Sequence, residues 1–300
     1  MPREMCLRRG RRLPSTEESP VSPAHPFGSD KSYWHRYTES FYPTIFEGRT
    51  IRNVAEFGTY RGDSVRWLQS VFPSAKIWSF DILPKSPEWP ISESVEYRTL
   101  DQGKRSQVRE VLESVSQKFD LIIEDGSHSP DHQRNCLLES IDFVAPGGVY
   151  VIEDIHTSLE ELRYEGLVAP ADLGHRRRRR QSPVLRRVSG FLRKIKAKKD
   201  SANRCVNVLT LVLAIERALK IGRRLSESEI AQLSTDGFIN ADEIATLAGA
   251  VREVLIYRRS TLPLACHQCV KGKFDYSNLR CECGARLYKD DDSMAAALFF

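Results

Sequence analysis

The sequence predicts a three-layer α/β fold, in which helices cover both faces of a mostly parallel, seven-stranded sheet. Short apolar runs, at residues 121–123 and 149–152, each end in a pair of acidic residues. Between them, apolar side chains recur at helical spacing from Cys136 to Val144, and the Pro-Gly-Gly sequence at 146–148 is expected to end that helix. Buried parallel strands joined by a crossover helix produce this pattern. Ligands bind such sheets beyond the carboxyl ends of the strands, where both acidic pairs are expected.

Length and composition indicate a globular protein with a sizeable core. The chain has 300 residues, 41% hydrophobic and 28% charged. No apolar run is long enough to span a bilayer, and the charged amino terminus does not resemble a secretory signal, so we expect a cytoplasmic protein. Four units are expected: a disordered arm (1–28), a cofactor- and metal-binding core (29–157), a basic and helical insert (158–258), and a Cys-rich hairpin with the last strand (259–300).

A glycine-rich turn follows the first expected strand, residues 51–57. It has the sequence EFGTYRGDS at 56–64 and leads into a helix. Gly58 permits a tight turn, and Gly62 lets the helix begin close to the strand, where unpaired N–H groups can face a ligand. The residues expected to line a cofactor site here are Glu56, Gly58, Thr59, Gly62 and Ser64.

Two further residues indicate the kind of cofactor. Asp81 follows the second expected strand, 76–80, where a carboxylate can accept hydrogen bonds from ribose hydroxyls. Tyr60 stands where a dinucleotide motif has the glycine that admits a pyrophosphate, so a cofactor without phosphates fits better. S-adenosylmethionine has a ribose and a positively charged amino-acid part, which Glu56 could face. The alternative is a plain βαβ unit with an incidental acid.

The third expected strand, 95–98, precedes another polar pair. Asp101 and Gln102 could hydrogen-bond an adenine edge. This signal is weak, because Asp is also common beside helix caps.

An aromatic segment at 29–47 precedes the first strand. Its rings recur at roughly helical spacing, with Pro43 as an expected break. They are expected either to pack in the core or to form a lid, with His35 and Tyr37 reaching into the site.

Asp125, Glu153 and Asp154 are three carboxylates at the ends of two neighbouring strands. Crowded like charges are costly unless one is protonated or a cation joins them, and oxygen ligands favour a hard cation such as Mg²⁺. His128 follows Asp125 by about one turn, where it could act as a base. The alternative for each acid taken alone is helix capping.

Several motifs together resemble the macrocin O-methyltransferase family over residues 29–157: SDKSYWHRYT, EFGTYRGDS, EDGSH and VIEDIHTS. Its members are class I S-adenosylmethionine-dependent enzymes that methylate sugar hydroxyls, and the family also includes cephalosporin-hydroxylase-like proteins. The resemblance implies a Rossmann-like class I methyltransferase fold, a sugar-bearing acceptor, Mg²⁺ at Asp125, Glu153 and Asp154, and His128 as general base. It also places Glu56, Gly58, Asp81, Asp101 and Gln102 in the cofactor site. We further expect a homo-oligomer.

Positive charge is concentrated in the insert. Residues 176–199 carry twelve Lys or Arg and no acid, which leaves 5 − 12 = −7 for the rest of the chain. The chain as a whole therefore lacks the charge pattern of a nucleic-acid-binding domain. Residues 175–199 could bind an anionic partner or membrane, or could form a solvated basic face.

Segment 206–258 is expected to be helical. Segment 259–300 is expected to contain a Cys-rich hairpin and the last strand. Two capping-box pairs, Ser226 with Glu229 and Asn240 with Glu243, predict helix starts. The four clustered thiols are expected to hold a structural Zn²⁺ in a hairpin between the last two strands, with free thiols or a redox pair as alternatives. These thiols are Cys266, Cys269, Cys281 and Cys283.

Three rival functions stay open. A hydroxylase would need redox iron, which usually takes two histidines and a carboxylate, and only His128 and His156 are near the acids in sequence. A nucleic-acid methyltransferase would use the basic insert and the hairpin. A non-catalytic interaction protein of the same fold would need none of the acids.

Overall fold

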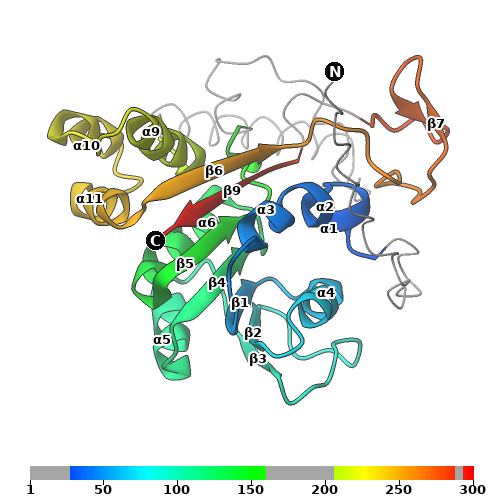
Figure 1. The fold of residues 1–300 in the computed structure, drawn as a ribbon, viewed down its shortest axis with the longest axis horizontal. Coiled ribbons are helices and arrows are strands. Elements are labelled where there is room, and N and C mark those ends of the chain that lie inside the picture. Colours follow the sequence, from blue (N-terminus) through cyan, green and yellow to red (C-terminus); the bar gives the residue numbers. More distant parts are fainter. Residues whose placement is uncertain (1–27, 160–205, 288–292) are drawn as a thin grey trace, which may run out of the picture.

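The computed structural model describes residues 28–159, 206–287 and 293–300, within which seven strands form one sheet. Their bounds are Asn53–Phe57 (β1), Lys76–Asp81 (β2), Val95–Thr99 (β3), Phe119–Glu124 (β4), Val144–Ile152 (β5), Glu253–Arg258 (β6) and Met294–Phe299 (β9). The order is β3-β2-β1-β4-β5-β9-β6, with β1 to β5 parallel and β9 antiparallel to both neighbours. The predicted mostly parallel, seven-stranded sheet is confirmed (Figure 1).

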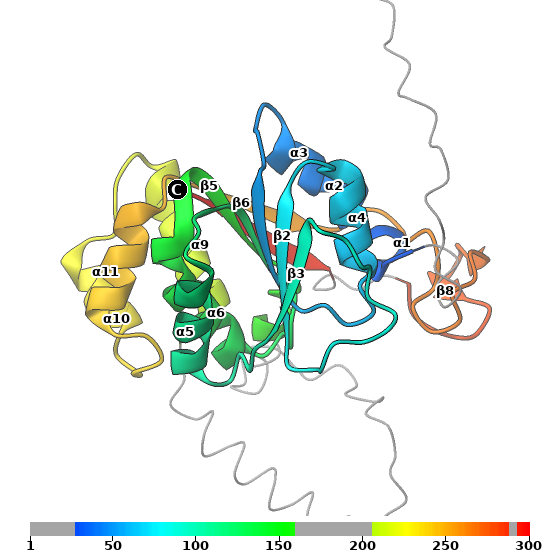
Figure 2. The ribbon, with the colours of Figure 1, turned by 90° about the horizontal axis from the view of Figure 1, so that it is seen from below.

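Helices cover both faces of the sheet, so the predicted three layers are confirmed (Figure 2). One face carries α5 (Arg105–Val115), α6 (Pro130–Ser140), α9 (Val208–Lys220) and α11 (Ala241–Ala250), with α10 (Glu227–Leu233) against α11. The other carries α2 (Tyr37–Ser40), α3 (Tyr42–Phe46) and α4 (Asp63–Val71), which are preceded in the chain by α1 (Asp30–Tyr33).

Strand β4 shows why these central strands read as unbroken apolar runs. Ile122 packs against the helices of one face, whereas Leu121 and Ile123 pack against those of the other. Successive side chains of a strand point to opposite faces, so a strand covered on both sides must be apolar throughout. Complete burial of each such side chain contributes about 1.5–3 kcal/mol.

The two predicted capping boxes are confirmed. Ser226 with Glu229 begins α10, and Asn240 with Glu243 begins α11, each pair exchanging side-chain and backbone hydrogen bonds. These contacts satisfy backbone N–H groups that a helix start leaves unpaired.

The prediction of helix throughout 206–258 is wrong at its end, where β6 forms. Val254 and Ile256 pack against the helices on one face of the sheet. Leu255 and Tyr257 pack against the helices on the other face. This two-residue alternation suits a strand, and β6 pairs with β9 along its whole length.

The bounds predicted around the Pro-Gly-Gly sequence are also wrong. The helix ends at Ser140, and β5 already begins at Val144 after a short 3-10 helix, η1 (Ile141–Phe143). The register of β4 against β5 shifts between the pairs Phe119–Val144 and Leu121–Val149, a span that contains the glycines, and Gly147 adopts a φ of +77°. The glycine segment is therefore a bulge inside a strand, which the sequence pattern does not distinguish from a turn.

The aromatic segment forms three short helices and packs mainly as core. Tyr37, Phe41 and Tyr42 are fully buried in the hydrophobic cluster on the face of the sheet that carries α4, as the core interpretation predicts. Pro43 lies in the first turn of α3. His35, in the same segment, lines the pocket described below.

Between β6 and β9 the chain forms the predicted Cys-rich hairpin, with strands β7 (Phe274–Asp275) and β8 (Arg280–Cys281). Figures 1 and 2 both show it beside α1, beyond the sheet.

The predicted arm, apart from Gly28, and the basic segment 175–199 lie outside the described residues. The anionic partner, the four-unit division, the homo-oligomer and the cytoplasmic location therefore stay predictions. Among the described helices, none has the length and apolar character needed to cross a membrane.

Candidate active site

A pocket of about 470 Å³ lies at the carboxyl ends of the five parallel strands. Residues that directly follow each of these strands line it. Those that the sequence singles out are Gly58, Asp81, Asp101, Gln102, Asp125, His128, Glu153 and Asp154. The other predicted cofactor residues, Glu56, Thr59, Gly62 and Ser64, are not among its lining residues.

Gly58 brings the loops after β1 and β4 into contact. It adopts a φ of +100°, and a Cβ built on it would overlap the backbone carbonyl of Asp125. Its N–H donates to the carbonyl of Phe80 at 2.7 Å. Only glycine combines this conformation with so close an approach, so glycine at position 58 allows the loops after β1 and β4 to lie in contact.

Asp81 holds the glycine turn in place. Its Oδ2 accepts hydrogen bonds from the N–H groups of Thr59 (2.7 Å) and Tyr60 (3.0 Å), and its Oδ1 accepts from the N–H of Leu83 at 2.8 Å. A carboxylate has about four lone-pair sites. Asp81 therefore keeps capacity for one more donor on the pocket side.

Gln102 is engaged by the protein itself. Its Nε2 donates to Glu124 at 2.7 Å, and its Oε1 accepts from the N–H of Ser127 at 3.0 Å. Asp101 accepts from the N–H of Gly103 at 2.9 Å. Gln102 thus fixes the shape of the pocket wall, and the predicted contact of its amide with adenine competes with these bonds.

Glu56 is a fully buried carboxylate beside the glycine turn. Its Oε1 accepts a hydrogen bond from Ser64, and its Oε2 has no hydrogen-bond partner among the described residues. Burial raises the pKa of Glu56 to about 7, although Lys31 lowers it. A buried carboxylate oxygen without a donor suits a positively charged ligand group.

Lys31 occupies the centre of the acidic cluster. Its Nζ lies 2.5 Å from Asp125 Oδ2, 2.6 Å from Glu153 Oε1 and 3.9 Å from Glu56 Oε1. Tyr42 also donates a hydrogen bond to Glu153. Burial disfavours the charged form of Lys31, but the three carboxylates outweigh this and raise its pKa well above the ordinary value. An ammonium ion therefore sits where the sequence predicts a metal.

Asp154 is surrounded by imidazoles. His35 Nδ1 lies 3.5 Å from Oδ1, His156 Nδ1 lies 3.9 Å from Oδ1, and His128 Nε2 lies 3.8 Å from Oδ2. Tyr37 donates a hydrogen bond to Oδ1 at 2.8 Å. Burial opposes ionisation of Asp154, but the three histidines hold its pKa well below the ordinary value.

His128 faces two carboxylates and is placed to exchange a proton. Its Nε2 lies 4.0 Å from Asp125 Oδ1 as well as near Asp154, and its Nδ1 has no hydrogen-bond partner within the described ranges. Burial lowers the pKa of His128, but Asp154 and Asp125 outweigh that effect and raise it.

Three of the residues that line this pocket adopt the left-handed backbone conformation. His128 and Asp154 have φ values of +55° and +48°, and Tyr60 has +48°. Residues with a Cβ rarely adopt this conformation, because it carries a conformational cost. The structure thus sets these three side chains at the pocket at a conformational cost.

Lys31 is the main site residue that the sequence does not predict. It lies 94 residues from Asp125 and 122 from Glu153 in the chain. The only signal is its place in the motif SDKSYWHRYT, whose aromatic residues mark a segment packed on the core.

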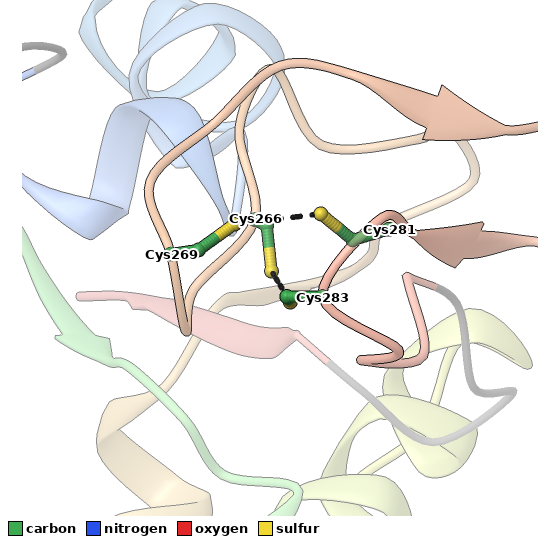
Figure 3. A group of neighbouring side chains, drawn as sticks. All are labelled: Cys266, Cys269, Cys281 and Cys283. Carbon is green, nitrogen blue, oxygen red and sulfur yellow. Dashed lines mark hydrogen bonds between the residues drawn. The ribbon is translucent and has the colours of Figure 1, made fainter.

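The four cysteines of the hairpin converge in space (Figure 3). All four Sγ atoms lie within 4.8 Å of one another, with Cys266 and Cys283 3.7 Å apart and Cys269 and Cys281 3.5 Å apart. Zn–S bonds of about 2.3 Å in a tetrahedron place sulfurs roughly 3.8 Å apart, whereas a disulfide needs about 2.05 Å. Within the described ranges, no other group of three or more Cys, His, Asp or Glu converges in this way.

Known proteins share the central part of this chain. Residues 55–155 match a family described as a methyltransferase domain. This chain is similar to that methyltransferase family over residues 55–155. The resemblance to macrocin-type O-methyltransferases that the motifs predict is confirmed over this segment.

The curated relatives match only part of this chain and a smaller part of their own length. Mycinamicin VI 2''-O-methyltransferase of Micromonospora griseorubida is 36% identical over 100 residues, which are 32% of this chain and 24% of that protein. Demethylmacrocin O-methyltransferase of Streptomyces fradiae is 33% identical over 99 residues, again 32% and 24%. The matched segments thus span about a quarter of these relatives' own length.

Among solved structures, the MycE methyltransferase from the mycinamycin biosynthetic pathway, in complex with Mg and SAH, is 22% identical. The TM-score is 0.41, with 62% of this chain and 44% of that chain covered. The segment matched by the family model, 55–155, contains the glycine turn, the three acids and His128, whereas Lys31, His35 and the four cysteines lie outside it.

Proposed function

We propose that this chain is an S-adenosylmethionine-dependent O-methyltransferase that acts on a hydroxyl group of a glycosylated small molecule. The observation that carries the proposal is a pocket in which the glycine turn adjoins a cluster of acids and histidines. The matched relatives are named as O-methyltransferases of mycinamicin and of a rhamnosyl tetracenomycin, which supports a sugar-bearing acceptor.

The residues at the glycine turn fit the methyl donor. Asp81 keeps capacity for a ribose hydroxyl, and Gly58 keeps the turn free of a side chain. The contact of Glu56 with the donor's amino group stays a prediction: its Oε2 has no hydrogen-bond partner among the described residues, but its buried carboxylate does not line the pocket. When bound, the donor supplies a methyl group on a positively charged sulfur.

In the proposed reaction, His128 takes the proton of the acceptor hydroxyl. The oxygen then forms a bond to the methyl carbon, and the carbon–sulfur bond breaks, with its electron pair staying on sulfur. Asp154 and Asp125 stabilise the resulting imidazolium, since both lie near His128 Nε2. Holding donor and acceptor in register supplies much of the acceleration.

Mg²⁺ fits this cluster less well than the sequence predicts. Two of its three expected ligands, Asp125 and Glu153, already share the Lys31 ammonium. The ion could join them only if Lys31 withdrew, because two cations at one point repel each other. Mg²⁺ stays a prediction, and the proposed reaction uses no step at a metal.

We also propose a structural Zn²⁺ at the four cysteines of the hairpin. Their sulfur spacing supports four thiolate ligands, which is the ligand set of a closed structural zinc site.

Calorimetric titration with S-adenosylmethionine tests the main proposal directly. We expect saturable binding with about one site per chain, with or without Mg²⁺. Absence of binding in both conditions would remove the proposal.

A His128→Ala variant tests the assigned base. Turnover on a sugar-bearing acceptor should fall by roughly 10²- to 10⁴-fold, while the donor's Kd should change by less than about threefold. Equal losses of both would identify His128 as a structural residue instead.

A further inference from the structure

The Cys-rich hairpin and α1 share a small hydrophobic core of their own. Tyr33 and Trp34 are buried there against Cys266 and Cys281 of the hairpin. The ring of Trp34 also lies 4.4 Å, centroid to centroid, from that of His267. The hairpin therefore packs directly on the segment that carries Lys31.

Polar contacts fix this packing. The carbonyl of Tyr33 accepts a hydrogen bond from the N–H of Leu264 at 2.7 Å. Arg259, buried at the end of β6, donates to the carbonyls of Trp34 and Leu287, both at 3.0 Å. Its guanidinium also lies 4.5 Å from the centroid of the Trp34 ring. Arg259 thus ties the end of α1 to the hairpin.

Neither partner of this contact is stable by itself. Helix α1 has four residues, far below the length at which an isolated helix forms in water. Strands β7 and β8 have two residues each, so the hairpin has little backbone pairing to define it. The four converging thiols would add a strong constraint on the hairpin when they bind a metal.

We propose that zinc bound by the hairpin braces α1 and so positions Lys31 in the acidic cluster. Lys31 lies two residues before Tyr33, the residue that the hairpin holds. Metal at the cysteines is thereby linked to the charge at Asp125 and Glu153. The link to donor binding rests on the proposed function, whereas the link between zinc and α1 does not.

Metal analysis and hydrogen exchange test the brace in the full-length chain. Native mass spectrometry of purified protein should show about one zinc per chain. Removing it with a chelator should abolish amide protection at residues 30–35, and one equivalent of Zn²⁺ should restore it. Absence of zinc, or two disulfides in its place, would overturn the proposal. So would unchanged protection of residues 30–35 after zinc removal.

Two variants separate metal binding from bracing. Replacement of both Cys281 and Cys283 with Ser should lose zinc and weaken donor binding by roughly tenfold. Arg259→Met should keep zinc yet weaken donor binding similarly, because it breaks the contact between hairpin and α1. Glu282→Gln, between the two cysteines, keeps every thiol and should behave as the wild type.

The outcomes distinguish the two proposals. If the wild type binds no donor but zinc protects residues 30–35, the methyltransferase function fails and the brace stands. If the wild type binds donor and the zinc-free protein binds it equally well, the link from brace to donor site is wrong. Circular dichroism of the zinc-free protein establishes that the sheet is still folded in these measurements.

Discussion

Lys31 supplies a fixed positive charge to acids from three strands, and the consequence can be tested by removing it. Lys31→Met leaves Asp125, Glu153 and Glu56 without their shared ammonium. An uncompensated buried charge costs about 3–5 kcal/mol, so the variant should unfold more easily when no metal is present. The same loss should raise Mg²⁺ affinity by about tenfold or more, measured by calorimetry.

Lys31→Arg is the matched control, because it keeps the charge. It should show the weak Mg²⁺ binding of the wild type. Equal Mg²⁺ affinity for Lys31→Met and the wild type would mean that Lys31 and the metal do not compete.

The positions of the three acids can be predicted from local sequence, whereas the position of Lys31 cannot. Asp125, Glu153 and Asp154 each follow a recognisable strand, and carboxyl ends of parallel strands meet at one edge of a sheet. Lys31 reaches the same point from a helix ahead of the first strand. No local rule states where such a helix docks, so its contacts depend on tertiary packing.

At the scale of elements, the sequence predicts which helices and strands form better than it predicts the residues at which they begin and end. The central parallel strands β1, β2, β4 and β5 carry apolar runs because both of their faces are buried, and this pattern is visible in the sequence. The edge strand β3 is only half-buried and has a more polar sequence. Strand β6 also packs on both faces, but it follows three helices in the chain and no strong turn signal precedes it in the sequence. The sequence therefore predicts helix where β6 forms. The bulge in β5 depends on pairing with β4, which is not a local property.

The turn after β1 depends on a single glycine. Gly58→Ala would add a Cβ in a disfavoured conformation and against the carbonyl of Asp125. We expect a loss of more than about 2 kcal/mol in the free energy of unfolding, because strain and overlap add. Donor binding should weaken as the loop moves. Urea unfolding and calorimetry measure the two effects.

Gly147→Ala is the control for conformation alone. Gly147 has a φ of +77°, but no atom lies within 4 Å of a Cβ built there. The change should cost about 1–2 kcal/mol and leave donor binding unchanged. Equal costs at the two positions would mean that the close approach at Gly58 is unimportant.

At the scale of the whole molecule, buried carboxylates at the site lower the free energy of unfolding when they are ionised. The sheet ends in acids that are buried with it, among them Glu56 and Glu124, both fully buried. Burial raises the pKa of each to about 7 from an ordinary 4.5. A folded state that holds these protons more tightly than the unfolded state loses stability as pH rises from 4.5 through 7.

The variant Glu124→Gln tests this effect through the free energy of unfolding, measured at several pH values. Glu124 Oε1 accepts a hydrogen bond from Gln102, but Oε2 has no partner among the described residues, so ionisation is poorly compensated. The neutral amide removes that cost above pH 7, where a shift of this size is worth roughly 3 kcal/mol. The variant should therefore be more stable than the wild type at pH 8, and the advantage should shrink toward pH 5. Glu110→Gln, exposed on α5, should show no such trend, and a pH-independent difference for Glu124→Gln would contradict the linkage.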